Sequence, residues 1–169
     1  MDEVTNTEKG CYTDHGVSGY GMAAKLSRND PMDDTFVRKM AEEMMMSIAE
    51  KCMAKGARAI GHIKSHIRTE SGTIKADTIG VKHGTYSTGS FEHPVKDIYL
   101  AVNSIVAGIK EGEVKDATLA GIHEVAEMEG VAIIKEKEHT YFDEFDFMQS
   151  KQDFVRQLAD QFKEKDVDG

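Results

Sequence analysis

Apolar and polar positions recur along this chain with two different periods. The first clear pattern has a period of about four, which is typical of one face of an amphipathic helix. Asn29, Asp30 and Pro31 precede it and predict its N-terminus, and Gly56 predicts its end. The apolar positions of this predicted helix are Phe36, Met40, Met44, Ile48 and Cys52.

The pattern changes to a period of two between residues 58 and 69. Ile63 and Ile67 alternate there with polar side chains, which predicts a half-buried β-strand with both isoleucines on its buried face. A short connection containing Gly72 leads into the β-branched run 73–81. We therefore expect the two segments to form a β-hairpin.

Further segments alternate between the two structure types. The run 97–109 is ambiguous, but its β-branched and aromatic residues favour a strand. Residues 113–129 read as a helix that ends at Gly130, and 131–142 read as an edge strand with alternating charges. Residues 82–94 read as a long loop.

These segments predict an α+β fold with a mainly antiparallel sheet of about four strands and helices on one face, a ferredoxin-like or related open sandwich. We expect a flexible or irregular N-terminal arm at 1–31 and a domain at 32–142. An amphipathic helix and a polar tail are expected at 143–169. That helix is a candidate surface for self-association or for a protein partner.

Composition narrows the possible partners. The chain has 169 residues, of which 40% are hydrophobic, and a net charge of -9. Such a charge repels phosphate backbones and anionic lipids, so we expect neither nucleic acid nor membrane as a partner. Two cysteines, Cys11 and Cys52, form no disulfide framework and favour a reducing, cytoplasmic location.

The most distinctive candidate site lies on the predicted strand 58–69. Its polar face carries His62, Lys64, His66 and Arg68, and alternate side chains of a strand are about 7 Å apart. Such a row of cations suits an anionic ligand. The alternative is a solvated face whose charges are balanced by Asp77, or across the sheet by Glu136 or Glu138.

Metal binding is a weaker prediction. His62 and His66 would be roughly 13 Å apart on a flat strand, which is too far for them to chelate one ion together. His83 and His93 flank the predicted loop and could join them if it folded over the sheet. Several methionines on the first helix could bind a soft metal, although core packing is their commoner role.

No catalytic residue is nominated, because the chain lacks a P-loop, a G-x-S-x-G and an H-E-x-x-H motif. The segment GARAIGHIKSHI, with the later DIYLAVNSIVAGI and GVAIIKEKEHTYF, resembles the region downstream of the GTPase domain in CobW-like metal-chaperone GTPases. The resemblance covers about residues 35–142. It implies kinship to an accessory domain in metal or corrinoid handling, with His62 and Lys64 in the matching segment.

The leading hypothesis is therefore a non-enzymatic binding or accessory protein that uses the basic strand face, with a metal ion or a corrinoid-related group as a possible ligand. One alternative is a small enzyme with a histidine acid or base, His83 or His93, in the 82–94 loop. Another alternative is a structural homo-oligomer.

Overall fold

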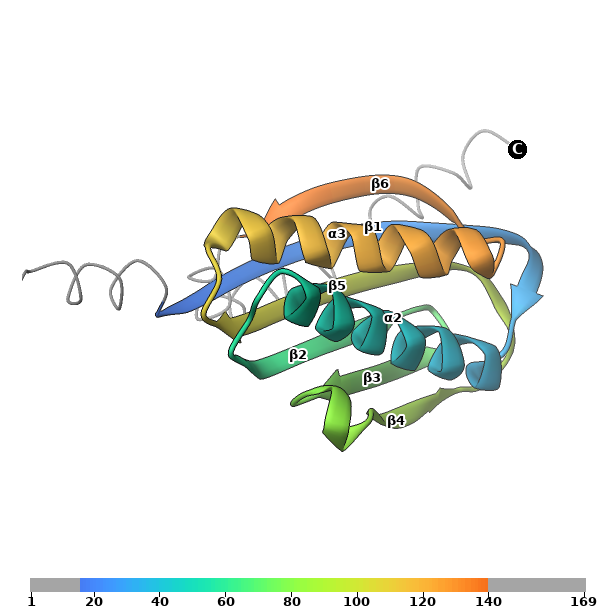
Figure 1. Cartoon of the computed structure of the whole chain (residues 1–169). Coiled ribbons are helices and arrows are strands. Elements are labelled where there is room, and N and C mark those ends of the chain that lie inside the picture. Colours follow the sequence, from blue (N-terminus) through green and yellow to red (C-terminus); the bar gives the residue numbers. More distant parts are fainter. Residues whose placement is uncertain (1–15, 140–169) are drawn as a thin grey trace, which may run out of the picture. The chain divides into compact units, whose positions relative to one another are not determined.

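The computed structural model describes residues 16–139, and Figure 1 shows their arrangement. The described residues form a six-stranded antiparallel sheet and two α-helices. In chain order the elements are β1 (Val17–Met32), α2 (Asp34–Ala54), β2 (Ala59–Arg68), β3 (Gly72–Thr78), the 3-10 turn η1 (Val81–His83), β4 (Tyr86–Phe91), β5 (Val95–Ala107), α3 (Glu111–Met128) and β6 (Ala132–His139).

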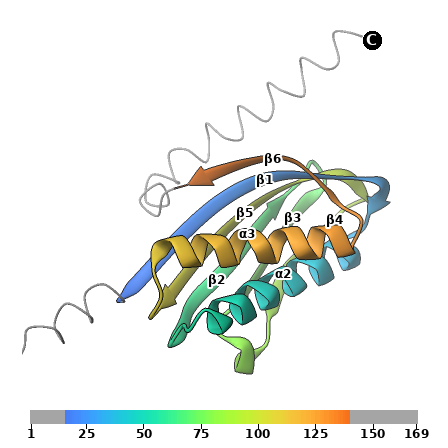
Figure 2. The same ribbon diagram turned by 45° about the horizontal axis from the view of Figure 1, so that its top comes forward.

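The strands lie in the order β4-β3-β2-β5-β1-β6. Both helices cover the same face of this sheet, as Figure 2 shows, so the described residues form two layers. The fold is therefore α+β with an antiparallel sheet and helices on one face, as expected. The sheet has six strands rather than about four, because two segments that were expected to be irregular are strands.

The first of these segments is β1. Residues 17–32 were expected to belong to an irregular arm, but they form a long strand inside the sheet, between β5 and the edge strand β6. Tyr20, Met22, Ala24 and Leu26 are buried under the helices and alternate with small or polar residues. The domain therefore begins before residue 32. The remainder of the expected arm, residues 1–15, lies outside the described range.

The start of α2 also differs from the expectation. Residues 29–32 still belong to β1, and the N-cap is Asp33. Its carboxylate accepts a hydrogen bond from the Phe36 backbone N–H at 2.8 Å, which satisfies one of the free donors at the helix start. The predicted apolar stripe is confirmed from Met40 to Cys52, all of whose predicted members are fully buried, while Phe36 is only partly buried.

The second unexpected strand is β4. The expectation of a continuous loop at 82–94 is wrong, because residues 86–91 pair with β3. The chain then crosses to β5 over the β2–β3 turn. Two hydrogen bonds between Ser71 and His93 hold this crossing. The Ser71 hydroxyl donates to the His93 carbonyl at 2.7 Å, and the His93 backbone N–H donates to the Ser71 hydroxyl oxygen at 2.7 Å.

The remaining central elements follow the sequence prediction. β2 and β3 form the expected antiparallel hairpin, and Ile63 and Ile67 are fully buried. The ambiguous segment is β5, with Ile98, Leu100 and Val102 buried. α3 packs closely on α2 at Gly121, where an added Cβ would lie 2.7 Å from Ile48 Cγ1. The predicted C-terminal helix lies outside the described residues.

Candidate functional site

The polar face of β2 points away from the helices. His62, Lys64, His66 and Arg68 alternate with the buried residues Ile63, Ser65 and Ile67, so all four lie on the other face of the sheet. We call this the outer face. Lys64 is exposed, and the other three are half-buried. Gly61 is an extra residue in the pairing of β2 with β5, and the alternation is regular from His62 onward.

Neighbouring strands add further polar groups to this row. Lys64 lies opposite Asp77 of β3, the aspartate that was expected across the hairpin from this row, and opposite Asn103 of β5. His66 lies opposite Lys75 of β3, so the cationic row is two strands wide at this point. Two lysines and a histidine therefore face a single aspartate in this part of the outer face.

Arg68 ends the row beside Tyr99 of β5. One of its guanidinium nitrogens lies 3.3 Å from His66 Nδ1. Burial lowers the pKa of Arg68 from its usual high value, and burial followed by the charge of Asp97 raises the pKa of Tyr99. Arg68 and Tyr99 are partly buried, whereas Lys64 and Lys75 are exposed.

A second group of cations lies on β1 and β6, which follow β5 in the sheet. Lys25 forms an ion pair with Asp97 at 3.7 Å and lies 5.8 Å from the centre of the Tyr99 ring. The register of β6 places Lys135 opposite Lys25. Between the basic row and these cations, the outer face of β5 carries Tyr99, Ala101 and Asn103. The outer face of β1 carries small residues beside Lys25: Gly19, Gly21 and Ala23.

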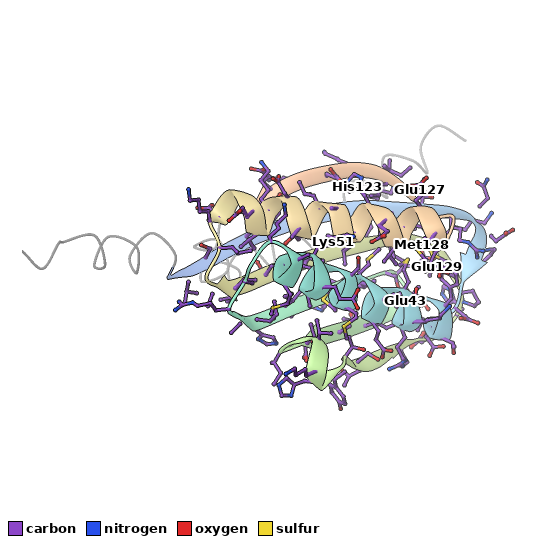
Figure 3. All side chains as sticks on the ribbon, in the orientation of Figure 1. Glu43, Lys51, His123, Glu127, Met128 and Glu129 are labelled. Carbon is purple, nitrogen blue, oxygen red and sulfur yellow. The ribbon has the colours of Figure 1, made fainter. Side chains whose placement is uncertain are left out.

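The helical layer has the opposite charge. The α3 sequence EGEVKDATLAGIHEVAEM contains five acidic residues and one lysine, a formal charge of -4. Glu124 of α3 forms an ion pair with Lys51 of α2 at 2.7 Å. Figure 3 shows this surface, with Lys51 and Glu43 on α2 and His123 and Glu127 on α3. Acidic groups thus predominate on α3 and basic groups on the outer face.

Glu136 and Glu138 were expected as residues that could balance the basic row across the sheet, but they do not face it. Both glutamates face the helical layer, where Glu136 contacts His123 and Glu138 contacts Lys115 of α3. They also lie near Tyr20, whose pKa is raised to about 12 by burial first and then by these carboxylates. His123 was not among the residues singled out from the sequence. The alternating charges of β6 could have indicated that Glu136 pairs with a polar residue of α3 such as His123.

The other histidine candidates are not brought together. His83 lies in η1 before β4, and His93 follows β4, with a six-residue strand between them. That strand occupies the predicted loop, which had to fold over the sheet for His83 and His93 to join His62 and His66 in a metal site. Among residues 16–139, no group of three or more His, Cys, Asp or Glu side chains could hold a metal ion.

Cys52 and most methionines of α2 lie in the core. Met40, Met44 and Met45 are fully buried, which confirms the packing interpretation for them, whereas Met53 is partly exposed. Cys52 is also fully buried, and burial raises the pKa of its thiol to about 11. A buried thiol with a raised pKa is a poor nucleophile at neutral pH. In residues 16–139, no helix is both long enough and apolar enough to cross a bilayer.

Comparisons with known proteins give only distant likenesses. No family model and no curated protein matches the chain. Among solved structures, AtUAH in complex with glyoxylate is 8% identical with a TM-score of 0.43, covering 79% of this chain and 30% of that chain. Zn(II)-bound YjiA GTPase from E. coli is 15% identical with a TM-score of 0.31, covering 63% of this chain and 30% of that chain.

A hydantoinase/carbamoylase family amidase from Burkholderia ambifaria is 11% identical with a TM-score of 0.40, covering 75% of this chain and 29% of that chain. The chain thus spans less than a third of the length of each of these structures. The likeness to the GTPase is a weak structural resemblance. None of the three likenesses is strong enough to support a function for this chain.

Proposed function

We propose that this chain is a non-enzymatic accessory module that binds an acidic polypeptide segment on the outer face of its sheet. The observation that carries the proposal is the row formed by Lys64, His66 and Arg68 on β2, widened by Lys75 on β3. Asp77 is the acidic residue paired with this row. The whole chain has a net charge of -9, so this local excess of cations is opposite in sign to the charge of the chain.

The spacing of the row suits an extended acidic peptide. Alternate side chains of β2 are about 7 Å apart, and alternate side chains of an extended partner have the same repeat. Each carboxylate of such a partner could therefore face one cation. The small residues beside the row, such as Ala101 and Ala23, leave room for the partner backbone or for an aromatic side chain. Charge complementarity of this kind favours rapid association.

We also infer that the domain is ferredoxin-like, with β3 and β4 as an added hairpin. The remaining elements, β1, α2, β2, β5, α3 and β6, follow the βαββαβ order of that fold. A role in metal or corrinoid handling is supported only by the CobW-like sequence resemblance. In that case the acidic segment would belong to a partner protein that carries the metal or the corrinoid.

The test is binding of a fluorescein-labelled peptide of alternating glutamate and tyrosine, followed by fluorescence anisotropy. The double variant Lys64→Ala, Lys75→Ala removes two charges from the outer face. We expect it to weaken binding at least about tenfold, since hydrogen bonds to charged groups contribute about 1.5–3 kcal/mol each. Added salt should weaken binding of the original chain, because salt screens exposed charges.

The matched control is Lys39→Ala with Lys55→Ala, which removes the same charge from α2 and its C-cap. It should bind the peptide as the original chain does. Equal loss in both double variants would show a general charge effect and would refute the assignment to the outer face. Equal binding of a poly-dT oligonucleotide would contradict selectivity for an acidic polypeptide.

A further inference from the structure

The two edges of the described sheet differ in chemistry. β6 carries Lys135 and Lys137 on the outer face and Glu136 and Glu138 on the helix face. A two-fold axis perpendicular to a sheet pairs edge strands antiparallel and opposes residues of the same face. Self-pairing of β6 would therefore oppose lysine to lysine and glutamate to glutamate, which is destabilising.

β4, at the other edge, lacks these barriers. Its sequence YSTGSF contains no charged residue and no proline, although charged residues and proline are common protections of edge strands. Its neighbour among the described strands is β3, on one side. Tyr86, Thr88 and Ser90 lie on the outer face, opposite Asp77, Lys75 and Thr73 of β3.

Exposed apolar side chains gather beside the same edge. Seven large hydrophobic residues are exposed in the described part of the chain. Three of them lie within eight residues of one another, at the start of β4 and in the turn before it: Ile79 at 54% exposure, Val81 at 40% and Tyr86 at 67%. Exposed apolar side chains that cluster in this way commonly mark a contact with another molecule.

We propose that two copies of this chain associate through β4, antiparallel about a two-fold axis at Thr88, to form one continuous sheet. Thr88 then opposes its own copy, and Tyr86 opposes Ser90 of the second copy. Threonine pairs and pairs of an aromatic with a small polar residue are compatible with an antiparallel ladder. We infer that the partner at this edge is a second copy of the chain, because β4 has no charged side chain that would repel the same strand of another copy.

Two features of β4 bear on this pairing. Gly89 has a φ of +99°, and an added Cβ there would lie 2.0 Å from the Thr73 carbonyl oxygen, on the β3 side. The absence of a side chain at Gly89 therefore allows β4 to lie close to β3. The Gly89 carbonyl also accepts a hydrogen bond from Arg38 of α2. A carbonyl has two acceptor lone pairs, so Arg38 leaves one available for the second copy.

The dimer would place both basic rows on one surface. The two β2 strands would be separated by five inter-strand spacings, or ~24 Å. An acidic partner with two separated segments could then engage both rows. This consequence depends on the proposed function, whereas the dimer itself does not.

The test is a charge exchange at Thr88, an exposed position. We expect the full chain to dimerise with increasing concentration in sedimentation equilibrium. Thr88→Lys and Thr88→Glu should each be monomeric over the same range, because each places like charges opposite one another. An equimolar mixture of the two variants should dimerise again, since lysine then opposes glutamate.

The matched control is Lys137→Glu on β6, which should leave the dimer unchanged. A monomeric original chain at every concentration would overturn the proposal. Dimers that persist in both Thr88→Lys and Thr88→Glu would also overturn it, because the association would then use another surface. Circular dichroism of each variant checks that a monomeric result does not arise from unfolding.

Discussion

The two faces of the sheet are made by alternate residues of the same strands, and they differ in burial and in charge. On β2, Ile63 and Ile67 are fully buried under the helices, while Lys64 between them is exposed on the outer face. The helix-covered face contains the methionine-rich core. The outer face contains small residues and cations. Adjacent residues of one strand therefore have different roles: Ile63 packs in the core, and Lys64 belongs to the proposed binding surface.

The largest expected effect tests this separation directly. Ile63→Ala should lower the free energy of unfolding by about 2–5 kcal/mol, because it leaves a cavity in a fully packed core. Lys64→Ala, one residue away, should change it by less than about 0.5 kcal/mol. Urea denaturation followed by circular dichroism measures both. A similar large loss in Lys64→Ala would show that the outer face contributes to the core.

A smaller effect is expected where the two helices meet. Gly121→Ala should destabilise the fold by about 1–3 kcal/mol, because the new methyl group would lie 2.7 Å from Ile48 Cγ1 and 2.9 Å from the Ile48 backbone nitrogen. The matched control is Gly112→Ala in the same helix, where no atom lies within 4 Å of the added Cβ. This control should stabilise the fold by about 0.4–1 kcal/mol. Thermal unfolding distinguishes the two variants.

At neutral pH the third effect on stability is the smallest, because it is zero there, and it develops only in alkali. Burial raises the pKa of Cys52 from 9.0 to about 11, and the pKa of Tyr20 rises from 10.0 to about 12. The unfolded chain therefore loses these protons at lower pH than the folded chain does. Their stabilising contribution is complete below about pH 9 and is lost as the pH rises towards 12.

The melting temperature should accordingly fall between pH 9 and pH 12. Tyr20→Phe should reduce the fall between pH 10 and 12, and Cys52→Ala should reduce it between pH 9 and 11. Each variant is compared with its own melting temperature at pH 7, so that any packing cost of the substitution cancels. An unchanged pH profile in both variants would show that neither group is held in its neutral form by burial.

The sequence predicted elements well where one periodicity was strong and local. The four-residue repeat of α2 and the alternation of β2 both correspond to the observed elements. β1 was missed although Tyr20, Met22, Ala24 and Leu26 alternate regularly. Most of its outer positions, Gly19, Gly21, Ala23 and Lys25, are residue types with low strand propensity. β1 is stable as a strand because it pairs with β5 on one side and β6 on the other.

β4 is a second strand that its local sequence did not predict. YSTGSF has the composition of a loop, and it is ordered as a strand through pairing with β3 and through contacts with the helical layer. The Ser87 hydroxyl donates to Glu42, and Arg38 donates to the Gly89 carbonyl. These partners are 45 and 51 residues away in sequence, so no local pattern could identify them.

The candidate site was predicted in part. The common face of His62, Lys64, His66 and Arg68 and the opposition of Lys64 to Asp77 both followed from strand alternation and the hairpin. The placement of Lys75 beside His66, and of Lys25 and Lys135 beyond β5, depended on the register between strands. The pairing of Glu136 with His123 depended on which face of β6 meets α3.

The sequence alone determined the α+β class, the amphipathic α2 and α3, and the row of cations along β2, because side-chain periodicity decides which residues of one element share a face. Only the tertiary structure decided that residues 17–32 and 86–91 are strands, which strands are neighbours, and which edge of the sheet is free of repelling charges. Those features arise from hydrogen bonds and packing between residues distant in sequence, and such contacts leave little trace in local composition.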